Sequence, residues 1–387
     1  MKIIGLMSGT SLDGIDAALV EISGKDLDLT IELIEARTFE YPHGLRSQIL
    51  RVCHNEPLTV AELAQLDDAI AVRFAVAASG VQPAGKTAEL VGSHGQTVYH
   101  RPPSVDRDSS QLNLGYSLQL GRGEAIANLT NLPTVSNFRA ADIAVGGQGA
   151  PLVPKIDLLL AHPTKYRVVQ NLGGIANLAW LPPRSQANWQ EEVKGWDTGP
   201  ANVLIDLAVS QLTAGKQTYD GNGAWALQGK PSQELVRQWL QQDYFQQMPP
   251  KSTGRELFNQ DYLNSCWEQA KSFNLSDADW IATISELTVA SIVHSYQNFL
   301  PQLPDEVLLC GGGSKNQYVR QRLEAELTST KIITTDEVGL NGDYKEAIAF
   351  AVLAYWRYCC NFPGNLPAVT SAARPVLLGD IHLPPSV

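Results

Sequence analysis

Two apolar segments in separate halves of the chain are each followed by a tight turn and a second apolar segment. Residues 2–6 precede a turn rich in glycine and serine, and residues 15–22 follow that turn. In the second half, residues 167–172 precede Gly173-Gly174, and residues 175–181 follow. Short apolar segments joined by such turns are typical of β-hairpins. The pattern favours two related halves, although their sequences are too dissimilar to establish an internal repeat.

Strand-like and helix-like patterns alternate along the rest of the chain. Residues 63–74 carry apolar side chains at helical spacing, which predicts a helix with one buried face. Residues 90–92 are predicted to form a short buried strand that ends before residues 93–97. Another buried strand is predicted at residues 307–310, and a helix rich in alanine and aromatic residues at 345–358. The alternation predicts the α/β class.

The length and the pattern together predict more than one domain. At about 150 residues per domain, 387 residues suggest two or three. We expect the chain to leave its first domain near residues 135–165 and to return to it near 345–365. Residues 1–135 with about 360–387 are assigned to the first domain, and about 136–359 to the second.

The charge balance excludes some partners. The chain has 40 acidic and 29 basic residues, a formal net charge of −11, and no basic block that offsets it. A nucleic-acid partner or an anionic membrane surface is therefore not expected. The polar segment 104–113, with its serine, aspartate and arginine residues, is predicted to be a surface loop.

Cysteine use and hydropathy bear on the compartment. No apolar run approaches the roughly 18 residues of a membrane-spanning helix, and the apolar start is too short for a signal peptide. The five cysteines include no C-x-x-C spacing, and the seven histidines have no ligand spacing. Neither a disulfide framework nor a structural zinc site is expected. We expect a protein of the reducing cytoplasm.

Two glycine-rich turns are candidates for binding phosphate. In the segment 8–16, closely spaced glycines would let backbone N–H groups approach an anion, but an ordinary hairpin turn has the same residues. The segment 311–316 lies between a strand and a helix, where a nucleotide site and a flexible connection are about equally plausible. Since both halves carry such a turn, a phosphate-bearing ligand between domains is favoured.

Several polar residues have two interpretations each. Asp197 precedes a predicted helix that has Pro200 in its first turn, so Asp197 is either a general base or, more commonly, a helix cap. His94 and Thr97 could contact substrate, although a lone histidine is more often structural. The segment 251–256 offers two cations, which either bind an anion or lie in a solvated loop.

Taken together, these motifs resemble the anhydro-N-acetylmuramic acid kinase family, within the superfamily of sugar kinases and actin-type ATPases. The resemblance runs from Gly5 to about Gly379. The matching segments are GLMSGTSLDGID at 5–16, GSHGQTVYH at 92–100, NFRAADIAVGGQGAPLVP at 137–154, NLGGIANL at 171–178, WDTGPANVLID at 196–206, PPKSTGRELFN at 249–259 and CGGGSKN at 310–316. Each motif is moderately specific, and the ordered set is highly specific.

The resemblance implies an ATP- and Mg²⁺-dependent kinase of peptidoglycan recycling. Such an enzyme opens the 1,6-anhydro ring of anhydro-N-acetylmuramic acid with water and phosphorylates O6, giving N-acetylmuramic acid 6-phosphate and ADP. The implied fold is α/β, with two RNase-H-like domains of the actin and hexokinase type and ATP in an interdomain cleft. A homodimer is also implied as a candidate assembly.

Site residues are carried over by motif position. Asp197 corresponds to the catalytic base, and Thr97, Arg139 and Glu346 correspond to positions around the sugar or the reaction centre. The residues implied in ATP binding are Gly9, Thr10, Ser11, Leu12, Asp13, Gly14, Ile15, Asp16, Gly311, Gly312 and Gly313.

No direct metal ligand is assigned with certainty, but Mg²⁺ carried by ATP is expected near Asp13 and Asp16. Two residues depart from the family pattern. Ala201 stands where the family usually has glycine, and Ser371 also replaces a common glycine. The alternative functions are a kinase of the same superfamily for another sugar or carboxylate, and a non-catalytic actin-like nucleotide switch.

Overall fold

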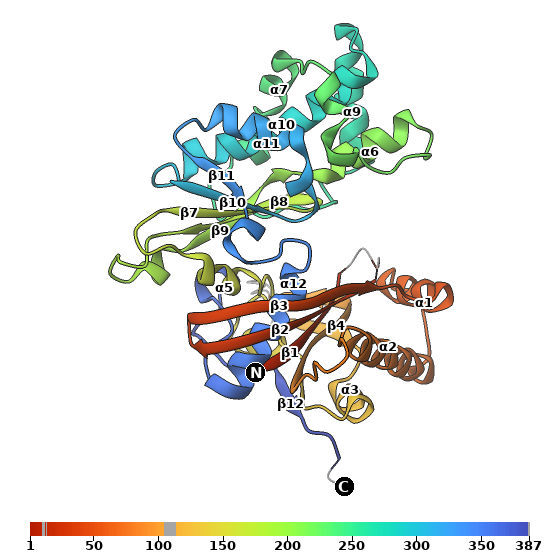
Figure 1. Ribbon diagram of the computed structural model, residues 1–387. Coiled ribbons are helices and arrows are strands. Elements are labelled where there is room, and N and C mark those ends of the chain that lie inside the picture. The colour runs from red at the N-terminus through yellow and green to blue at the C-terminus, as the bar shows by residue number, and fades with distance from the viewer. Residues whose placement is uncertain (10–11, 13, 104–113, 386–387) are drawn as a thin grey trace. The chain divides into compact units, whose positions relative to one another are not determined.

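The computed structural model describes residues 1–9, 12, 14–103 and 114–385. The predicted loop 104–113 and three of the proposed ATP-binding residues, Thr10, Ser11 and Asp13, lie outside the described residues. The chain divides into two compact units (Figure 1). Unit 1 comprises residues 1–159 and 344–387, and unit 2 comprises residues 160–343.

The described residues of unit 1 form one seven-stranded sheet. Its strands are β1 (Lys2–Ser8), β2 (Ile15–Lys25), β3 (Asp28–Phe39), β4 (Leu90–Arg101), β5 (Tyr116–Leu120), β6 (Thr134–Ser136) and β12 (Asp380–His382). They lie in the order β12-β6-β4-β1-β2-β3, with β5 paired to β4. Strands β1, β2 and β3 are an antiparallel meander, whereas β4 runs parallel to β1 and β6 parallel to β4.

The longer helices of unit 1 cover both faces of this sheet. The helices of the unit are α1 (His43–Cys53), α2 (Val60–Gly80), α3 (Gly123–Thr130), α4 (Ala140–Ala144), α5 (Pro154–Asp157), α12 (Lys345–Tyr355) and α13 (Pro367–Thr370), with a π-helical turn at Trp356–Cys360. Helix α2 begins at a capping box, in which Thr59 and Glu62 bond each other's backbone N–H groups.

Successive side chains of β1 point to opposite faces of the sheet, where they meet different helices. Ile4 and Leu6 share a hydrophobic core with Phe74 of α2. On the opposite face, α12 packs directly on β1 and β4. A Cβ atom at Gly5 or Gly92 would overlap a carbonyl oxygen of α12. Glycine at these two positions therefore lets the helix lie close against the sheet.

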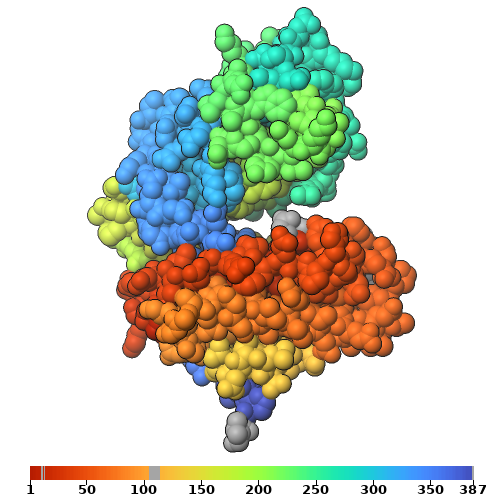
Figure 2. Space-filling model, turned by 45° about the vertical axis from the view of Figure 1, so that its right-hand side comes forward, coloured from red at the N-terminus to blue at the C-terminus, as the bar shows by residue number. Residues whose placement is uncertain are grey.

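The edge strand β3 has the alternating exposure of a strand with one solvated face. In the space-filling view, the first part of the chain, red to orange, covers much of the visible face of unit 1 (Figure 2).

Unit 2 has a five-stranded sheet among its described residues. The strands are β7 (Arg167–Leu172), β8 (Ile175–Leu181), β9 (Lys194–Pro200), β10 (Glu306–Cys310) and β11 (Lys331–Thr334). The α-helices are α6 (Asn202–Leu212), α7 (Gln233–Trp239), α8 (Asp243–Gln246), α9 (Gln260–Ala270), α10 (Asp277–Phe299) and α11 (Gln317–Glu326). Short 3₁₀ turns include Gly221–Gly223, Ala226–Gln228 and Gly312–Lys315.

The two sheets share one strand order. Unit 1 reads β3-β2-β1-β4-β6, and unit 2 reads β9-β8-β7-β10-β11. In both, the first three strands in sequence are an antiparallel meander, and the next two add parallel to the first. This is the RNase-H-like arrangement. The predicted hairpins, the α/β class and the two related halves are therefore confirmed.

The chain crosses between the units within the expected range 135–165 and directly before the expected range 345–365, but the limits assigned to the two domains differ. The chain leaves unit 1 after residue 159 and returns at residue 344, so 136–159 and α12 belong to unit 1 rather than to the second domain. The reason is a buried polar cluster as well as the α12 contact with the sheet. The Asp142 carboxylate accepts hydrogen bonds of 2.8 Å from both Asn365 and Thr370, which joins the two parts of unit 1.

Three local predictions are also corrected. Strand β4 continues to Arg101, so residues 93–97 lie within it and not after it. Pro200 ends strand β9, and α6 begins two residues later at Asn202, so Pro200 is not in the first helical turn. The helix predicted to reach residue 358 ends at Tyr355, where the π-helical turn begins.

We expect Gly92→Ala to lower the free energy of unfolding by roughly 1–3 kcal/mol or more, because the added methyl group overpacks the α12 contact. Gly44→Ala in α1 is the matched control, since nothing lies within 4 Å of its Cβ position. That variant should be neutral or up to about 1 kcal/mol more stable. Urea unfolding followed by circular dichroism measures both. Equal stability of the Gly92 variant and the unaltered protein would contradict the close approach.

Candidate active site

Asp197 lies on β9, with its carboxylate held by a loop from far along the chain. Its Oδ2 accepts hydrogen bonds from the Ser252 hydroxyl and the Thr253 backbone N–H, both at 2.9 Å. The backbone is fixed as well, because Asp197 N–H donates to the Lys251 carbonyl at 3.2 Å. The Tyr244 hydroxyl donates to the Asp197 carbonyl at 2.8 Å. Strand β9 and the loop 251–253 therefore hold one oxygen of this carboxylate in place.

This geometry excludes the helix-cap interpretation of Asp197. The N-cap of α6 is Ala201, which makes no side-chain capping bond, and Asp197 lies in the preceding strand. Partial burial raises the pKa of the Asp197 carboxyl, and the charge of Glu256 raises it further. The bonds from Thr253 and Ser252 oppose this effect because they favour the ionised form. The environment thus favours proton uptake while two donors stabilise the base.

Lys251 anchors the same loop and is not a solvated cation. Its Nζ donates to the carbonyls of Tyr244 at 3.0 Å and Phe245 at 3.2 Å. It also lies 4.8 Å from the centres of the Tyr244 and Phe299 rings. Burial lowers the pKa of Lys251 to about 8. Because these contacts use its ammonium group, Lys251 stabilises the loop that positions Asp197.

In unit 1, residues from three distant segments form a charged cluster. Glu346 lies in the first turn of α12. The pKa of its carboxyl is raised mainly by burial. Lys345 and Arg139 lower this pKa and Asp16 raises it. The side chain of Glu346 is nevertheless exposed on part of its surface. Asp16 and Arg139, which the sequence also singled out, therefore lie within electrostatic reach of Glu346.

Thr97 lies on β4, three residues after His94, and is half-buried. Its hydroxyl accepts a 3.1 Å hydrogen bond from Gln119 of β5. This bond joins Thr97 to the neighbouring strand and not to a ligand-binding group. Its assignment to the sugar therefore stays a prediction.

Gln96 holds the start of the first glycine-rich turn and was not predicted from the sequence. Its Oε1 accepts hydrogen bonds from the hydroxyls of Ser8 at 2.7 Å and Tyr41 at 3.1 Å. Its Nε2 donates to the Gly9 carbonyl at 3.3 Å. The Ser8 hydroxyl also lies 2.9 Å from the Gly14 carbonyl, and its single proton is shared between this oxygen and Gln96 Oε1. A buried amide in the neighbouring strand thus shapes the turn from both ends.

The other described residues of this turn divide into core and backbone roles. Leu12 and Ile15 are buried in the core of unit 1, so their side chains cannot face a ligand. Leu12 has a φ of 56°, and its carbonyl accepts a 3.0 Å bond from Arg46. The Thr38 hydroxyl donates to the Asp16 carboxylate at 2.6 Å. Side chains from α1 and β3 therefore fix two of the described residues of this segment, Leu12 and Asp16.

The turn 311–313 of unit 2 needs glycine for the fold itself. Gly311 has a φ of 78°, in the left-handed region, and its Cβ would overlap the Asn171 side chain. A Cβ at Gly313 would lie 2.8 Å from the Asn202 side chain. These contacts explain Gly311 and Gly313 without a ligand, whereas a Cβ at Gly312 would meet nothing within 4 Å. Both interpretations of the turn stay open.

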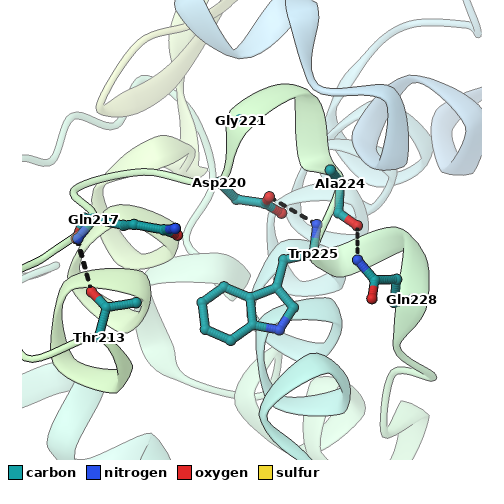
Figure 3. A pocket seen from close by; sticks show the side chains of 7 residues that line it. All are labelled: Thr213, Gln217, Asp220, Gly221, Ala224, Trp225 and Gln228. Carbon is teal, nitrogen blue, oxygen red and sulfur yellow. Dashed lines mark hydrogen bonds between the residues drawn. The ribbon is translucent and has the colours of Figure 1, made fainter.

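A cavity of about 430 Å³ lies in unit 2 near this turn (Figure 3). It is lined by Thr213, Gln217, Asp220, Gly221, Ala224, Trp225 and Gln228. The neighbouring turn at Gly221–Gly223 packs on Asn316, so closely that a Cβ at Gly223 would overlap the Asn316 amide. Figure 3 shows the Trp225 indole directed into the lined space. With an aromatic face and no lysine or arginine, the cavity suits a flat uncharged group.

The two departures from the family pattern have different structural settings. Ala201 has a φ of −112° and is buried, and its carbonyl accepts a 3.3 Å bond from Thr288. This φ lies outside the left-handed region that favours glycine. Ser371 has a φ of 62°, in the region that glycine favours, which explains the common glycine at this position.

Within the described residues, no group of three or more histidine, cysteine, aspartate or glutamate side chains is placed to hold a metal ion.

Comparisons with known proteins found matches that cover nearly the whole chain. The family model for anhydro-N-acetylmuramic acid kinase matches residues 1–384. A protein of that name from Gloeothece citriformis (strain PCC 7424) is 64% identical over 99% of both chains. One from Rippkaea orientalis is 60% identical over 99% of this chain and 100% of its own. A solved ROK family glucokinase from Streptomyces griseus has a TM-score of 0.41 and 12% identity, covering 92% of this chain and 99% of its own.

Two variants should move the pKa of Asp197 in opposite directions. Ser252→Ala removes a donor to the ionised carboxylate, so we expect the pKa to rise. Glu256→Gln removes a nearby negative charge, so we expect it to fall. Carbon-13 NMR of aspartate-labelled protein across a pH titration measures both shifts. Shifts in the same direction would contradict the described contacts.

Proposed function

This chain belongs to the anhydro-N-acetylmuramic acid kinase family, and we propose that it opens the anhydro ring of that sugar with water and phosphorylates O6. The products are N-acetylmuramic acid 6-phosphate and ADP, and the pathway served is cell-wall recycling. Family membership over the whole chain carries this conclusion. It identifies the protein as an enzyme that uses ATP.

The substrate dictates what the protein must do. A 1,6-anhydro sugar is a cyclic acetal without a free O6 hydroxyl, so transfer to O6 requires that the C1–O6 bond breaks. We assign Asp197 to take a proton from the water that attacks C1. The departing O6 then accepts the γ-phosphoryl group.

The contacts of Asp197 support this role. Two donors hold its Oδ2 at 2.9 Å, whereas no described residue bonds its Oδ1. The free oxygen can face a water molecule while the other keeps the carboxylate oriented. Partial burial raises the pKa of the group, which strengthens it as a base.

We assign the ATP phosphates to the turn 9–16, and we propose that the turn 311–313 faces the nucleotide. Support for the first comes from Gln96 and Ser8, which shape its backbone. Support for the second comes from the neighbouring cavity, because the Trp225 indole offers a stacking face for a base.

Mg²⁺ fits the carboxylates of unit 1. The charge of Asp16 raises the pKa of Glu346, and a divalent cation would relieve that repulsion. Mg²⁺ in proteins is commonly held by one or two carboxylates and the phosphates of its nucleotide. We therefore propose that Mg²⁺ binds near Asp16, with Asp13 as the other carboxylate that the sequence predicts there. When bound, the ion offsets phosphate charge during transfer.

We assign Thr97, Arg139 and Glu346 to the sugar and the reaction centre. The grouping of Arg139 with Glu346 supports the assignment, since a cation and a carboxylate can together bind hydroxyl and carboxylate groups of a sugar acid.

Location and assembly are further proposals. None of the described helices has the length and apolar character needed to cross a membrane. We propose a cytoplasmic enzyme, where ATP is supplied, and a homodimer as its assembly. Light scattering coupled to size-exclusion chromatography measures the assembly directly.

Release of ADP tests the function. We expect ADP to form when ATP, Mg²⁺ and anhydro-N-acetylmuramic acid are all present, and not when the sugar is left out. A panel of other sugars and carboxylates tests the alternative kinase function. Nucleotide-dependent light scattering without turnover would instead favour the actin-like switch.

Asp197→Asn should lower turnover by roughly 10²–10⁴-fold with unchanged ATP affinity and melting temperature. The amide oxygen can still accept bonds from Ser252 and Thr253, so the geometry persists while the base is lost. Asp206→Asn is the matched control, because the pKa of Asp206 is also raised by burial, to about 6, yet we assign it no role. Near-normal turnover of the Asp197 variant would contradict its assignment.

A further inference from the structure

His94 lies buried on β4 and contacts Phe350 and Arg139 of unit 1. Its ring centre lies 4.6 Å from that of Phe350 on α12, and the side chain is 3% exposed. Its Nε2 atom receives two N–H groups of Arg139, from Nε at 3.1 Å and from Nη2 at 2.8 Å. One histidine nitrogen thus accepts both N–H groups along one edge of the guanidinium.

These partners define the protonation of His94. Nε2 can accept from Arg139 only if it carries no proton, because a guanidinium has donors and no acceptor. The other ring nitrogen, Nδ1, lies 2.9 Å from the Gly95 carbonyl and must therefore donate to it. His94 is neutral, with its proton on Nδ1. Burial and the charge of Arg139 both lower the pKa of His94, which agrees with this assignment.

A second contact completes the orientation of Arg139. Its Nη1 donates to the Gly149 carbonyl at 2.6 Å, and the Gly149 N–H donates to buried Asp142 at 2.8 Å. Three of the five guanidinium N–H groups are used in this way. Within the described residues, one N–H on each terminal nitrogen remains for a ligand. Arg139 is therefore held with a pair of donors still available.

We propose that His94 is a positioning residue, whose neutral imidazole fixes the Arg139 guanidinium in the orientation that binds the sugar. The inference rests on the proposed contact between Arg139 and the sugar. It gives His94 a role that acts through Arg139, without contact between His94 and the substrate. Without the Nε2 acceptor, two N–H groups of a partly buried cation lose their partner, and the side chain is free to turn.

Two substitutions at the same position separate this role from packing. Gln carries an amide group near the place of Nε2, so His94→Gln can still accept from Arg139. Asn reaches only to the place of Nδ1, so His94→Asn keeps a donor for the Gly95 carbonyl and loses the acceptor for Arg139. Both variants lose the ring contact with Phe350 to a similar degree. They differ in which bond of His94 they keep, Gln the one to Arg139 and Asn the one to the Gly95 carbonyl.

We expect His94→Asn to raise the KM for the anhydro sugar roughly 10- to 100-fold, the range of a lost hydrogen bond to a charged group. The KM for ATP should stay within about two-fold, while His94→Gln should recover most of the sugar KM. Arg139→Ala should raise the sugar KM at least as much, and adding His94→Asn to it should change nothing further.

Equal impairment of the Gln and Asn variants, or no impairment in either, would overturn the inference. If Arg139→Ala leaves the sugar KM unchanged, the assignment of Arg139 to the sugar is wrong, and the inference falls with it. If the unaltered protein forms no ADP with the sugar, the proposed function fails. The pair itself can then still be tested by nitrogen-15 NMR of histidine-labelled protein. In the unaltered protein, a proton on Nε2 or a charged imidazole at neutral pH would contradict the hydrogen bond between His94 and Arg139.

Discussion

The close packing of α12 on β1 and β4 is the contact on which unit 1 depends. Glycine at 5 and 92 removes the side chains that would keep the helix away. The first turn of this helix carries Lys345, which forms a buried 2.6 Å ion pair with Asp157, and Glu346. Because α12 comes from the far end of the sequence, its docking closes a discontinuous unit and brings Glu346 to Arg139. The close packing of α12 on the sheet thus contributes to the core and also positions Glu346.

Both units hold a proposed reactive group with partners from another segment. In unit 2, Ser252 and Thr253 hold Asp197. In unit 1, His94 and Gly149 hold Arg139. In each case some hydrogen-bonding capacity is used for orientation and the rest is left for a ligand. Such preorganisation keeps the reacting groups in place without cost at the moment of reaction.

Local pattern was enough to predict the two hairpins, the strand β10 and the two related halves, because period and turn residues are local signals. It gave no expectation for several other strands, among them β3 and β9. It misled at Asp197, since a Thr-Gly-Pro sequence before a helix looks like a cap, whereas β9 continues to Pro200. Gln96 and Ser252 were not predicted, because their bonds join residues 88 and 55 positions apart. The domain limits depended on α12 and on Asp142, whose partners also lie far along the chain. The periodicity of apolar residues gives no information on contacts between residues so far apart in the sequence.

The central claim is that Asp197 activates water for attack at C1, and the fate of oxygen tests it most directly. The reaction is run in oxygen-18 water, quenched before the open-chain form exchanges label, and the product is fragmented in a mass spectrometer. The account predicts prompt label on the C1 hydroxyl and unlabelled oxygen between C6 and phosphorus. Label in the C6–O–P bridge, or a product without prompt label at C1, would contradict it.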